Sequence, residues 1–131
     1  MIGLDTNVLV RYLTQDDPEQ SARASHLIET RCTRHEPGRI SLVVLCELTW
    51  VLEGAYEYGK KLVVQVLEHI LASRELSVEN EDIARSALAA FRRGRADFAD
   101  YVIVFSNRSA GCETTYSFDS DLVRHDFVHL P

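Results

Sequence analysis

The sequence predicts an α/β fold in which a mainly parallel sheet of four to five strands is covered by helices on both faces. Short strand-like segments alternate with longer helical ones, an order typical of parallel sheets with helical crossovers. The length of 131 residues suits one domain with its own core, and the sequence has no internal repeat, low-complexity segment or linker. We therefore expect residues 1–131 to form a single domain.

The expected strands are short, and two of them are followed directly by an aspartate. The first is the apolar opening of the chain, which stops at Asp5, and the fourth is a β-branched and aromatic run that stops at Asp119. The five expected strands cover residues 1–4, 39–42, 75–79, 114–118 and 127–130. Ligands of open α/β sheets bind beyond the carboxyl ends of the strands, so both acids are expected to face one crevice.

The expected helices follow the spacing of apolar residues and the residues that begin helices. Asp17 is a good N-cap and Pro18 a good first helical residue, while Ser41 and Asn80 can cap two later helices. The expected helices cover residues 8–13, 18–33, 42–56, 60–73, 81–95 and 97–111, with a helical turn at 122–125. The helix over 42–56 is apolar nearly all round, so we expect it to be buried.

Three further acids are candidates to join Asp5 and Asp119. Glu47 is the only ionisable residue in the first three turns of its apolar helix, where burial without a partner is costly. It either faces a gap in the packing, against water or an arginine, or points into the crevice. Asp97 is equally well explained as an ordinary helix cap, and Asp100 shares its helix face. Carboxylates gathered without histidine favour a hard cation, Mg²⁺ or Mn²⁺.

A carboxylate site of this kind predicts phosphoryl chemistry. A metal ion held there lowers the pKa of a bound water and neutralises charge on the phosphate, while Thr6 and Asn7 orient an acid or the water. The five histidines have no ligand-like spacing, and there is no Gly-rich phosphate loop, GxSxG motif or Cys–His pair. These absences exclude the mononucleotide-binding, serine-triad and thiol-protease classes.

The charge balance gives a mixed indication about nucleic acid. A net charge of −6 argues against such a partner, although acids gathered at a metal site inflate this count. Of the 14 basic residues 12 are arginines, which favours phosphate binding, but a GC-rich genome explains the bias equally well. The arginines considered for flanking phosphates are Arg11, Arg92, Arg93 and Arg95, with Arg108 and Arg124 as further candidates.

The sequence also predicts a cytoplasmic protein. No apolar run approaches about 18 residues, and the N-terminus lacks the basic segment of a signal peptide. The three cysteines are odd in number, far apart and without a CxxC pair, so we expect reduced thiols.

Four segments, taken in order, form a recognisable pattern. They are Ile-Gly-Leu-Asp-Thr-Asn-Val-Leu at 2–9, Val-Leu-Cys-Glu-Leu at 44–48, Ala-Asp-Phe-Ala-Asp at 96–100 and Ser-Phe-Asp at 117–119. Each segment is common alone, but the four in this order are specific. Through them the chain resembles the PIN-domain family, and within it the VapC-type toxins of bacterial and archaeal toxin–antitoxin pairs. The resemblance implies a three-layer α/β/α sandwich and a Mg²⁺- or Mn²⁺-dependent endoribonuclease whose usual targets are structured RNAs such as tRNA or rRNA.

The resemblance also implies roles for particular residues. The acids at the positions of the family's catalytic and metal-binding quartet are Asp5, Glu47, Asp100 and Asp119. The supporting polar positions are Thr6, Asn7, Asp97 and Ser117, the last of which keeps the hydroxyl of the usual threonine. Tyr101 stands where the family often has a small residue, so it either narrows the site or points into the core.

Family members are usually homodimers inhibited by a small antitoxin, here of the VapB type. The antitoxin's C-terminal segment lies in a groove near the acids. The helices expected over 42–56 and 60–73 form an antiparallel hairpin, and this hairpin, with Trp50, Tyr56 and Tyr58, would be part of the groove. Two alternatives stay open. One is a PIN-like RNA-binding module with weak or no catalysis, and the other is a phospho-accepting domain or phosphohydrolase with Asp5 as nucleophile.

Overall fold

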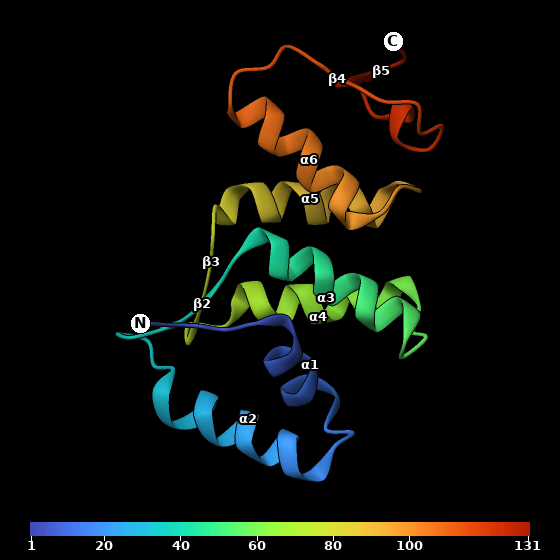
Figure 1. Ribbon diagram of the computed structural model, residues 1–131. Helices are drawn as coiled ribbons and strands as arrows, with labels where there is room; N and C mark the ends of the chain where they lie inside the picture. The colour runs from blue at the N-terminus through green and yellow to red at the C-terminus, as the bar shows by residue number, and fades with distance from the viewer. The chain divides into compact units, whose positions relative to one another are not determined.

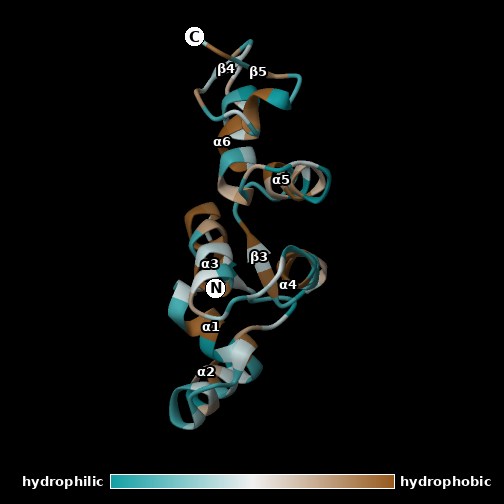
Figure 2. Cartoon of the chain, turned by 90° about the vertical axis from the view of Figure 1, so that its right-hand side faces the viewer, coloured by the Kyte–Doolittle hydropathy of each residue, from teal (hydrophilic) through white to brown (hydrophobic).

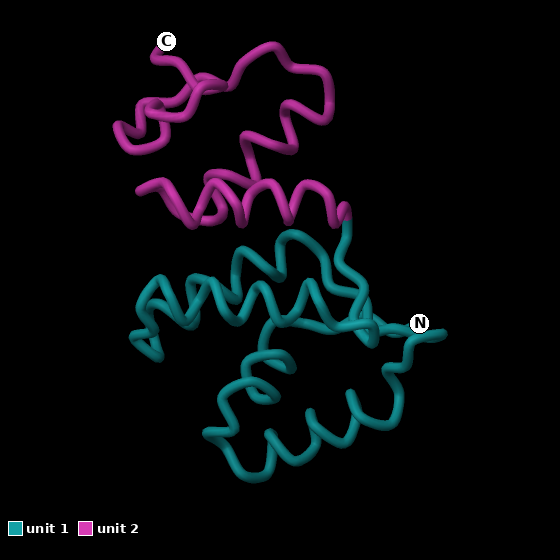
Figure 3. Tube along the Cα trace, turned by 180° about the vertical axis from the view of Figure 1, so that it is seen from behind, with its two compact units in different colours: residues 1–79 teal, residues 80–131 magenta.

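The computed structural model describes all residues from Met1 to Pro131, and their elements follow one another as Figure 1 shows. The chain divides into two compact units, residues 1–79 and residues 80–131, which are coloured separately in Figure 3.

Residues 1–79 form a parallel α/β unit. Its elements are β1 (Ile2–Gly3), α1 (Thr6–Thr14), α2 (Pro18–Arg31), β2 (Gly38–Ile40), α3 (Leu42–Gly54), α4 (Lys60–Ala72) and β3 (Leu76–Val78). The strands lie in the order β1-β2-β3, and both pairs are parallel, with Gly38 opposite Ile2 on one side and Leu76 on the other. Figure 2 shows α1 and α3 on one side of these strands and α4 on the other.

Local capping explains where the helices of this unit begin. The Asp17 carboxylate accepts a hydrogen bond from the Gln20 N–H and Pro18 follows it, so the predicted start of α2 is confirmed. Ser41 Oγ accepts from the Val44 N–H at 3.2 Å, which begins α3 and ends β2 earlier than the sequence predicts.

The core of the unit is made by leucine, isoleucine and valine side chains of α1, β2, α3 and α4, including Leu9, Ile40, Leu45, Leu48, Leu52, Leu67 and Ile70.

The prediction that the helix over 42–56 is buried is wrong for one face of α3. Leu45, Leu48 and Leu52 are fully buried, but Val43 and Trp50 are 67% and 52% exposed. An all-apolar composition does not by itself determine which side of a helix meets the sheet. The exposed residues recur at the spacing of one helix face, and this face also carries Glu47.

Residues 80–131 form the second unit, with α5 (Glu81–Arg93), α6 (Phe98–Ser109), β4 (Thr115–Tyr116), the 3₁₀ turn η1 (Leu122–Arg124) and β5 (Val128–His129). Helices α5 and α6 pack through an edge-to-face pair of Phe91 and Phe98, whose ring centroids are 6.1 Å apart. Strands β4 and β5 are parallel and pair only with each other.

The observed strands differ from the expected ones in length and in grouping. They form a three-stranded and a two-stranded sheet, where the sequence predicted one sheet of four to five strands. The expected strand over 114–118 is reduced to β4, because the chain beyond it is turned by side chains, with Ser117 Oγ accepting from the Asp119 N–H at 3.0 Å. The α/β class with parallel strands is confirmed.

None of the helices combines the length and the apolar character needed to cross a membrane.

Candidate functional site

A pocket of about 400 Å³ lies beyond the end of β1, at the N-terminus of α1. Strand β1 places Asp5 at this point, where it is the N-cap of α1 and accepts the Thr6 N–H through Oδ1 at 2.8 Å. Helix α3 contributes Glu47 to the lining of the same pocket. Two of the acids that the sequence singled out are therefore close to each other in the first unit, together with Thr6 and Asn7.

Thr6 joins the two carboxylates of this pocket. Its backbone N–H donates to Asp5, and its hydroxyl donates to Glu47 Oε1 at 2.8 Å. The residue is only 9% exposed, so its side chain is fixed by the surrounding core. The arrangement holds Glu47 toward Asp5 without neutralising either charge, since a hydroxyl and an amide carry none.

Neither carboxylate has an ion-pair partner, although Arg11 lines the pocket. The Arg11 guanidinium instead binds Asp16, with Nη1 at 2.9 Å from Oδ1, and also contacts Gln20 and Tyr56. The Tyr56 hydroxyl donates to Asp16 Oδ2 at 2.5 Å, and this bond is the main cause that lowers the pKa of Asp16 to about 2. Arg11, a predicted phosphate ligand, is therefore already engaged by an acid.

In the second unit, Asp97 and Asp100 form a capping box at the start of α6. The Asp97 N–H donates to Asp100 Oδ2 at 3.1 Å, so Asp97 has the capping position that the sequence allowed for it. Burial raises the pKa of Asp100 above its ordinary value, and the charges of Asp97 and Asp119 raise it further. The hydrogen bond from Asp97 opposes this rise. The charge of Asp119 thus acts on Asp100, although Asp97, Asp100 and Asp119 do not gather closely enough to form a ready-made cation site.

Asp119 follows β4 and has a structural role that the sequence did not indicate. Its Oδ1 accepts the N–H groups of Asp121 and Leu122 at 2.9 and 3.1 Å and so begins the turn η1. The hydroxyl of Ser117 fixes the backbone of Asp119. Because one carboxylate oxygen supports the turn, Oδ2 is the oxygen that remains for an external ligand.

Two other predictions concern α5 and α6. Arg93 and Arg95 line a pocket of about 720 Å³ in the second unit, whereas Arg92 does not. Tyr101 points into the core, is 2% exposed, and accepts the Ala96 N–H through its hydroxyl at 3.4 Å. This observation decides between the two roles considered for Tyr101.

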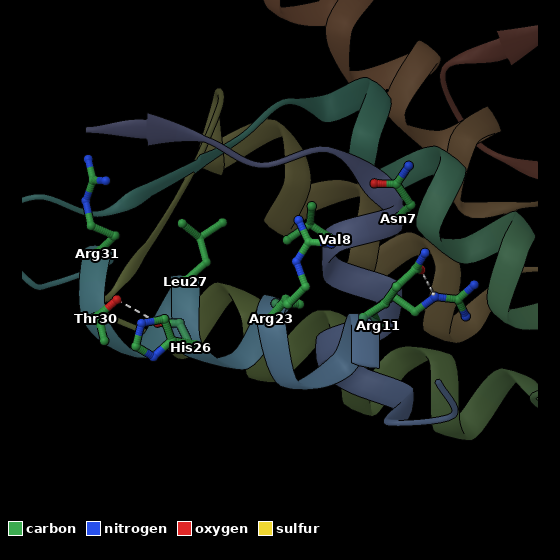
Figure 4. Close-up of a pocket in the computed structure, with 10 residues that line it drawn as sticks. Asn7, Val8, Arg11, Arg23, His26, Leu27, Thr30 and Arg31 are labelled. Carbon is green, nitrogen blue, oxygen red and sulfur yellow. Dashed lines mark hydrogen bonds between the residues drawn. The ribbon is translucent and has the colours of Figure 1, made fainter. Parts of the chain in front are cut away.

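Two arginines of α2 were missed by the sequence reasoning. Arg23 and Arg31 line a pocket of about 810 Å³, the pocket drawn in Figure 4, which shares Asn7 and Arg11 with the pocket of Asp5. Their spacing of eight residues, with Leu27 midway, places all three on one face of a helix and was the available signal.

The donors of the pocket of Asp5 and Glu47 fit a hard divalent cation. Within neither unit do three or more His, Cys, Asp or Glu side chains gather as a ready-made cage. However, Mg²⁺ usually keeps several waters and uses one or two carboxylates together with substrate phosphates. The pocket of Asp5 and Glu47 offers two unpaired carboxylates and no cysteine or histidine, which matches this preference.

Comparison with known proteins gives two findings. The family model described as PIN domain matches residues 2–128. A curated protein of Aquifex aeolicus (strain VF5), named VapC ribonuclease, is 24% identical over 115 residues, which cover 88% of this chain and 84% of the relative.

Proposed function

Because the chain belongs to the PIN domain family, we propose that it is a metal-dependent endoribonuclease that acts as the toxin of a toxin–antitoxin pair. The likeness to a protein named VapC ribonuclease supports the activity and the toxin role. The single structural observation that carries the proposal is the pocket in which Thr6 joins the unpaired carboxylates of Asp5 and Glu47. We further propose one PIN domain over residues 1–131 and structured RNA of the tRNA or rRNA class as substrate.

The proposed metal ligands are Asp5, Glu47, Asp100 and Asp119, and the cation is Mg²⁺ or Mn²⁺. When bound, such an ion supplies an activated water and neutralises the charge that develops on the phosphate. Asp5 is fixed by its cap on α1, and Glu47 is oriented by the Thr6 hydroxyl. The pKa of Asp100 is raised by burial and by the charges of Asp97 and Asp119, and a cation beside this carboxylate would oppose both effects by favouring its ionised form.

The supporting residues of the proposal act through the ligands. Thr6 orients Glu47, Asp97 holds the Asp100 carboxylate through its N–H, and Ser117 fixes the backbone before Asp119. Asn7 is exposed on the lining of the pocket, where its amide is in a position to orient a water or a phosphate oxygen.

The proposed partners are a small VapB-type antitoxin and a second copy of the chain, in the cytoplasm. Trp50 is exposed on the face of α3 that carries Glu47, and Tyr56 lines the pocket of Asp5 and Glu47. Aromatic side chains of this kind are enriched where proteins bind partners.

The test replaces Asp5 or Asp100 by Asn and measures cleavage of purified total RNA with Mn²⁺, together with growth arrest after induced expression. We expect cleavage to fall on the order of a hundredfold or more, because each change removes a proposed ligand of the ion. Asp82→Asn, an exposed acid in the first turn of α5, is the matched control and should cleave normally. Undiminished cleavage by Asp5→Asn or Asp100→Asn would overturn the assignment.

Calorimetric titration separates catalysis from simple RNA binding. The proposed nuclease should bind Mn²⁺ with a heat that Asp5→Asn abolishes. A PIN-like RNA-binding module with weak or no catalysis should bind RNA without that heat.

A further inference from the structure

The surface between α1 and α2 has an electrostatic character opposite to that of the whole chain. The lining of its pocket of about 810 Å³ contains three arginines, one histidine and no acidic residue. The chain as a whole carries a net charge of −6, so a hollow of this size without an acid stands apart from the rest of the surface. We call it the arginine groove and define it by Arg23, Arg31, Leu27, Val8 and Asn7.

Two of the three arginines are available to a ligand. Arg23 and Arg31 are exposed, and neither has a hydrogen-bond or ion-pair partner. Eight residues separate them, which corresponds to slightly more than two helical turns, or about 12 Å along the axis of α2. Figure 4 shows their side chains and that of Leu27 rising from the same side of α2, toward α1 and the strand before it.

The third arginine separates the groove from the candidate acids. Arg11 is bound to Asp16 and Gln20, so it shapes the wall and adds little free charge. Asn7 and Arg11 line both the arginine groove and the pocket that holds Asp5 and Glu47. The two hollows therefore adjoin each other at these two residues of α1.

We propose that the arginine groove binds the sugar–phosphate backbone of the RNA substrate, next to the bond that is cut. Arg23 and Arg31 each bind a phosphate, for which the guanidinium fork is suited because it donates two parallel hydrogen bonds. The apolar floor of Val8 and Leu27 packs against ribose or base. This inference rests on the proposed ribonuclease function. It adds a surface that binds the RNA strand and that does not include the predicted acids.

Continuity with the acid pocket favours RNA over an acidic segment of a partner protein. The cleaved strand must extend from the reacting phosphate on at least one side, and the groove is the basic surface that adjoins Asp5 through Asn7. The backbone supplies one negative charge per nucleotide at regular intervals, which matches two cations separated along one helix.

The test measures RNA affinity at several KCl concentrations by fluorescence anisotropy. The probe is a short, fluorescein-labelled single-stranded RNA of mixed sequence, and all proteins carry Asp5→Asn so that the probe stays uncut. Arg23→Ala/Arg31→Ala is compared with Arg34→Ala/Arg74→Ala, which removes two exposed arginines outside both pockets. Arg23→Lys/Arg31→Lys keeps the charge but loses the fork, and circular dichroism checks that each variant is folded.

Loss of two phosphate contacts should reduce the slope of log affinity against log salt by roughly 1.4 in Arg23→Ala/Arg31→Ala. The affinity of this variant at low salt should fall about tenfold, since two charged contacts are lost. The Lys pair should keep the slope, and the control pair should match the parent. An unchanged slope in Arg23→Ala/Arg31→Ala would overturn the proposal.

Two other results have a definite meaning. Selective loss of binding to a labelled polyglutamate peptide, with RNA binding intact, would overturn the proposal and assign the groove to an acidic protein segment. Absence of RNA cleavage by the wild-type protein with Mn²⁺ would overturn the proposed function, whereas the comparison of RNA affinities would still decide the role of the groove.

Discussion

At the scale of single residues, Thr6 is the side chain that organises the candidate site. Its hydroxyl donates to Glu47 and its N–H to Asp5, and it does so from a nearly buried position. A residue that orients a ligand in this way is expected to affect activity more than stability, because the carboxylate it holds is itself exposed.

Thr6→Val keeps the shape of the side chain and removes only the donor. We expect cleavage to fall roughly 10- to 100-fold and the free energy of unfolding to fall by about 1 kcal/mol. Cleavage kinetics and urea unfolding measure the two effects. Thr6→Ser keeps the hydroxyl and should retain most of the activity; equal activity of the Val and wild-type proteins would argue against an orienting role.

A second residue-scale prediction concerns acid stability. Tyr56 lowers the pKa of Asp16 to about 2 from an ordinary value of 3.8, so ionised Asp16 stabilises the fold above about pH 4. This contribution is lost as the pH falls through 3.8 toward 2. In Tyr56→Phe the pKa of Asp16 should rise toward its ordinary value and the melting temperature at neutral pH should fall.

NMR titration of Asp16 and thermal melts at several pH values check this prediction. Tyr58→Phe is the control, because Tyr58 contacts the Tyr56 ring edge-on but makes no hydrogen bond to Asp16. If the Asp16 titration were identical in Tyr56→Phe and in the wild type, the hydroxyl would not be the cause.

The sequence indicated which residue types belong to the candidate site but not how they are joined. Asp5, Thr6 and Glu47 were selected because of their chemistry and their places at element ends. The bond between Thr6 and Glu47 joins residues 41 positions apart, and that between Tyr56 and Asp16 joins residues 40 apart. Local sequence patterns extend over a few residues, so they indicate the candidate residues but not contacts between residues so far apart in the chain.

At the scale of elements, the position after α5 requires glycine, because the Tyr101 side chain of α6 lies very close to Gly94. A Cβ at this position would lie 1.8 Å from the Tyr101 hydroxyl oxygen and 2.8 Å from its ring carbon. The glycine therefore allows α6 to place Tyr101 in the core. No local pattern of the sequence gives this requirement, since Gly94 is also an ordinary residue after a helix.

Gly94→Ala is expected to lower the free energy of unfolding by about 2 kcal/mol, because Tyr101 must be displaced. Tyr101→Phe should recover part of this loss in the double variant, and a double-mutant cycle by urea unfolding measures the coupling. Gly54→Ala, at the end of α3 with no atom within 4 Å of the added carbon, is the control and should be neutral or stabilising. Additive effects at Gly94 and Tyr101 would contradict the steric argument.

The elements that the sequence predicted best are those with local signals. Asp17, Pro18 and Ser41 define helix starts within four residues, and the structure places the caps there. The burial of α3 was predicted wrongly for the face of Val43 and Trp50, because it depends on neighbours distant in sequence. The strands are only two or three residues long, so their ends and their grouping depend on pairing partners and not on composition.

At the scale of the whole molecule, the family match over residues 2–128 spans both compact units. The second unit has two helices and a two-stranded sheet of two-residue strands, and such a sheet is marginal alone in water. We therefore predict that residues 80–131 expressed alone are largely unfolded by circular dichroism. The full chain should unfold in one calorimetric transition with equal calorimetric and van't Hoff enthalpies. Two separate transitions would show that the units are independent domains.

The pairing of β1 has a consequence for the order in which the protein is made. Ile2 pairs with Gly38, and the Asp5 pocket includes Glu47. The residues synthesised first therefore cannot complete these contacts until residues synthesised much later have left the ribosome. The proposed ligands Asp100 and Asp119 follow later still. On the proposed function, a nascent chain therefore carries no nuclease activity for most of its translation. An antitoxin synthesised during this interval can bind the newly made toxin before the toxin is able to cleave RNA.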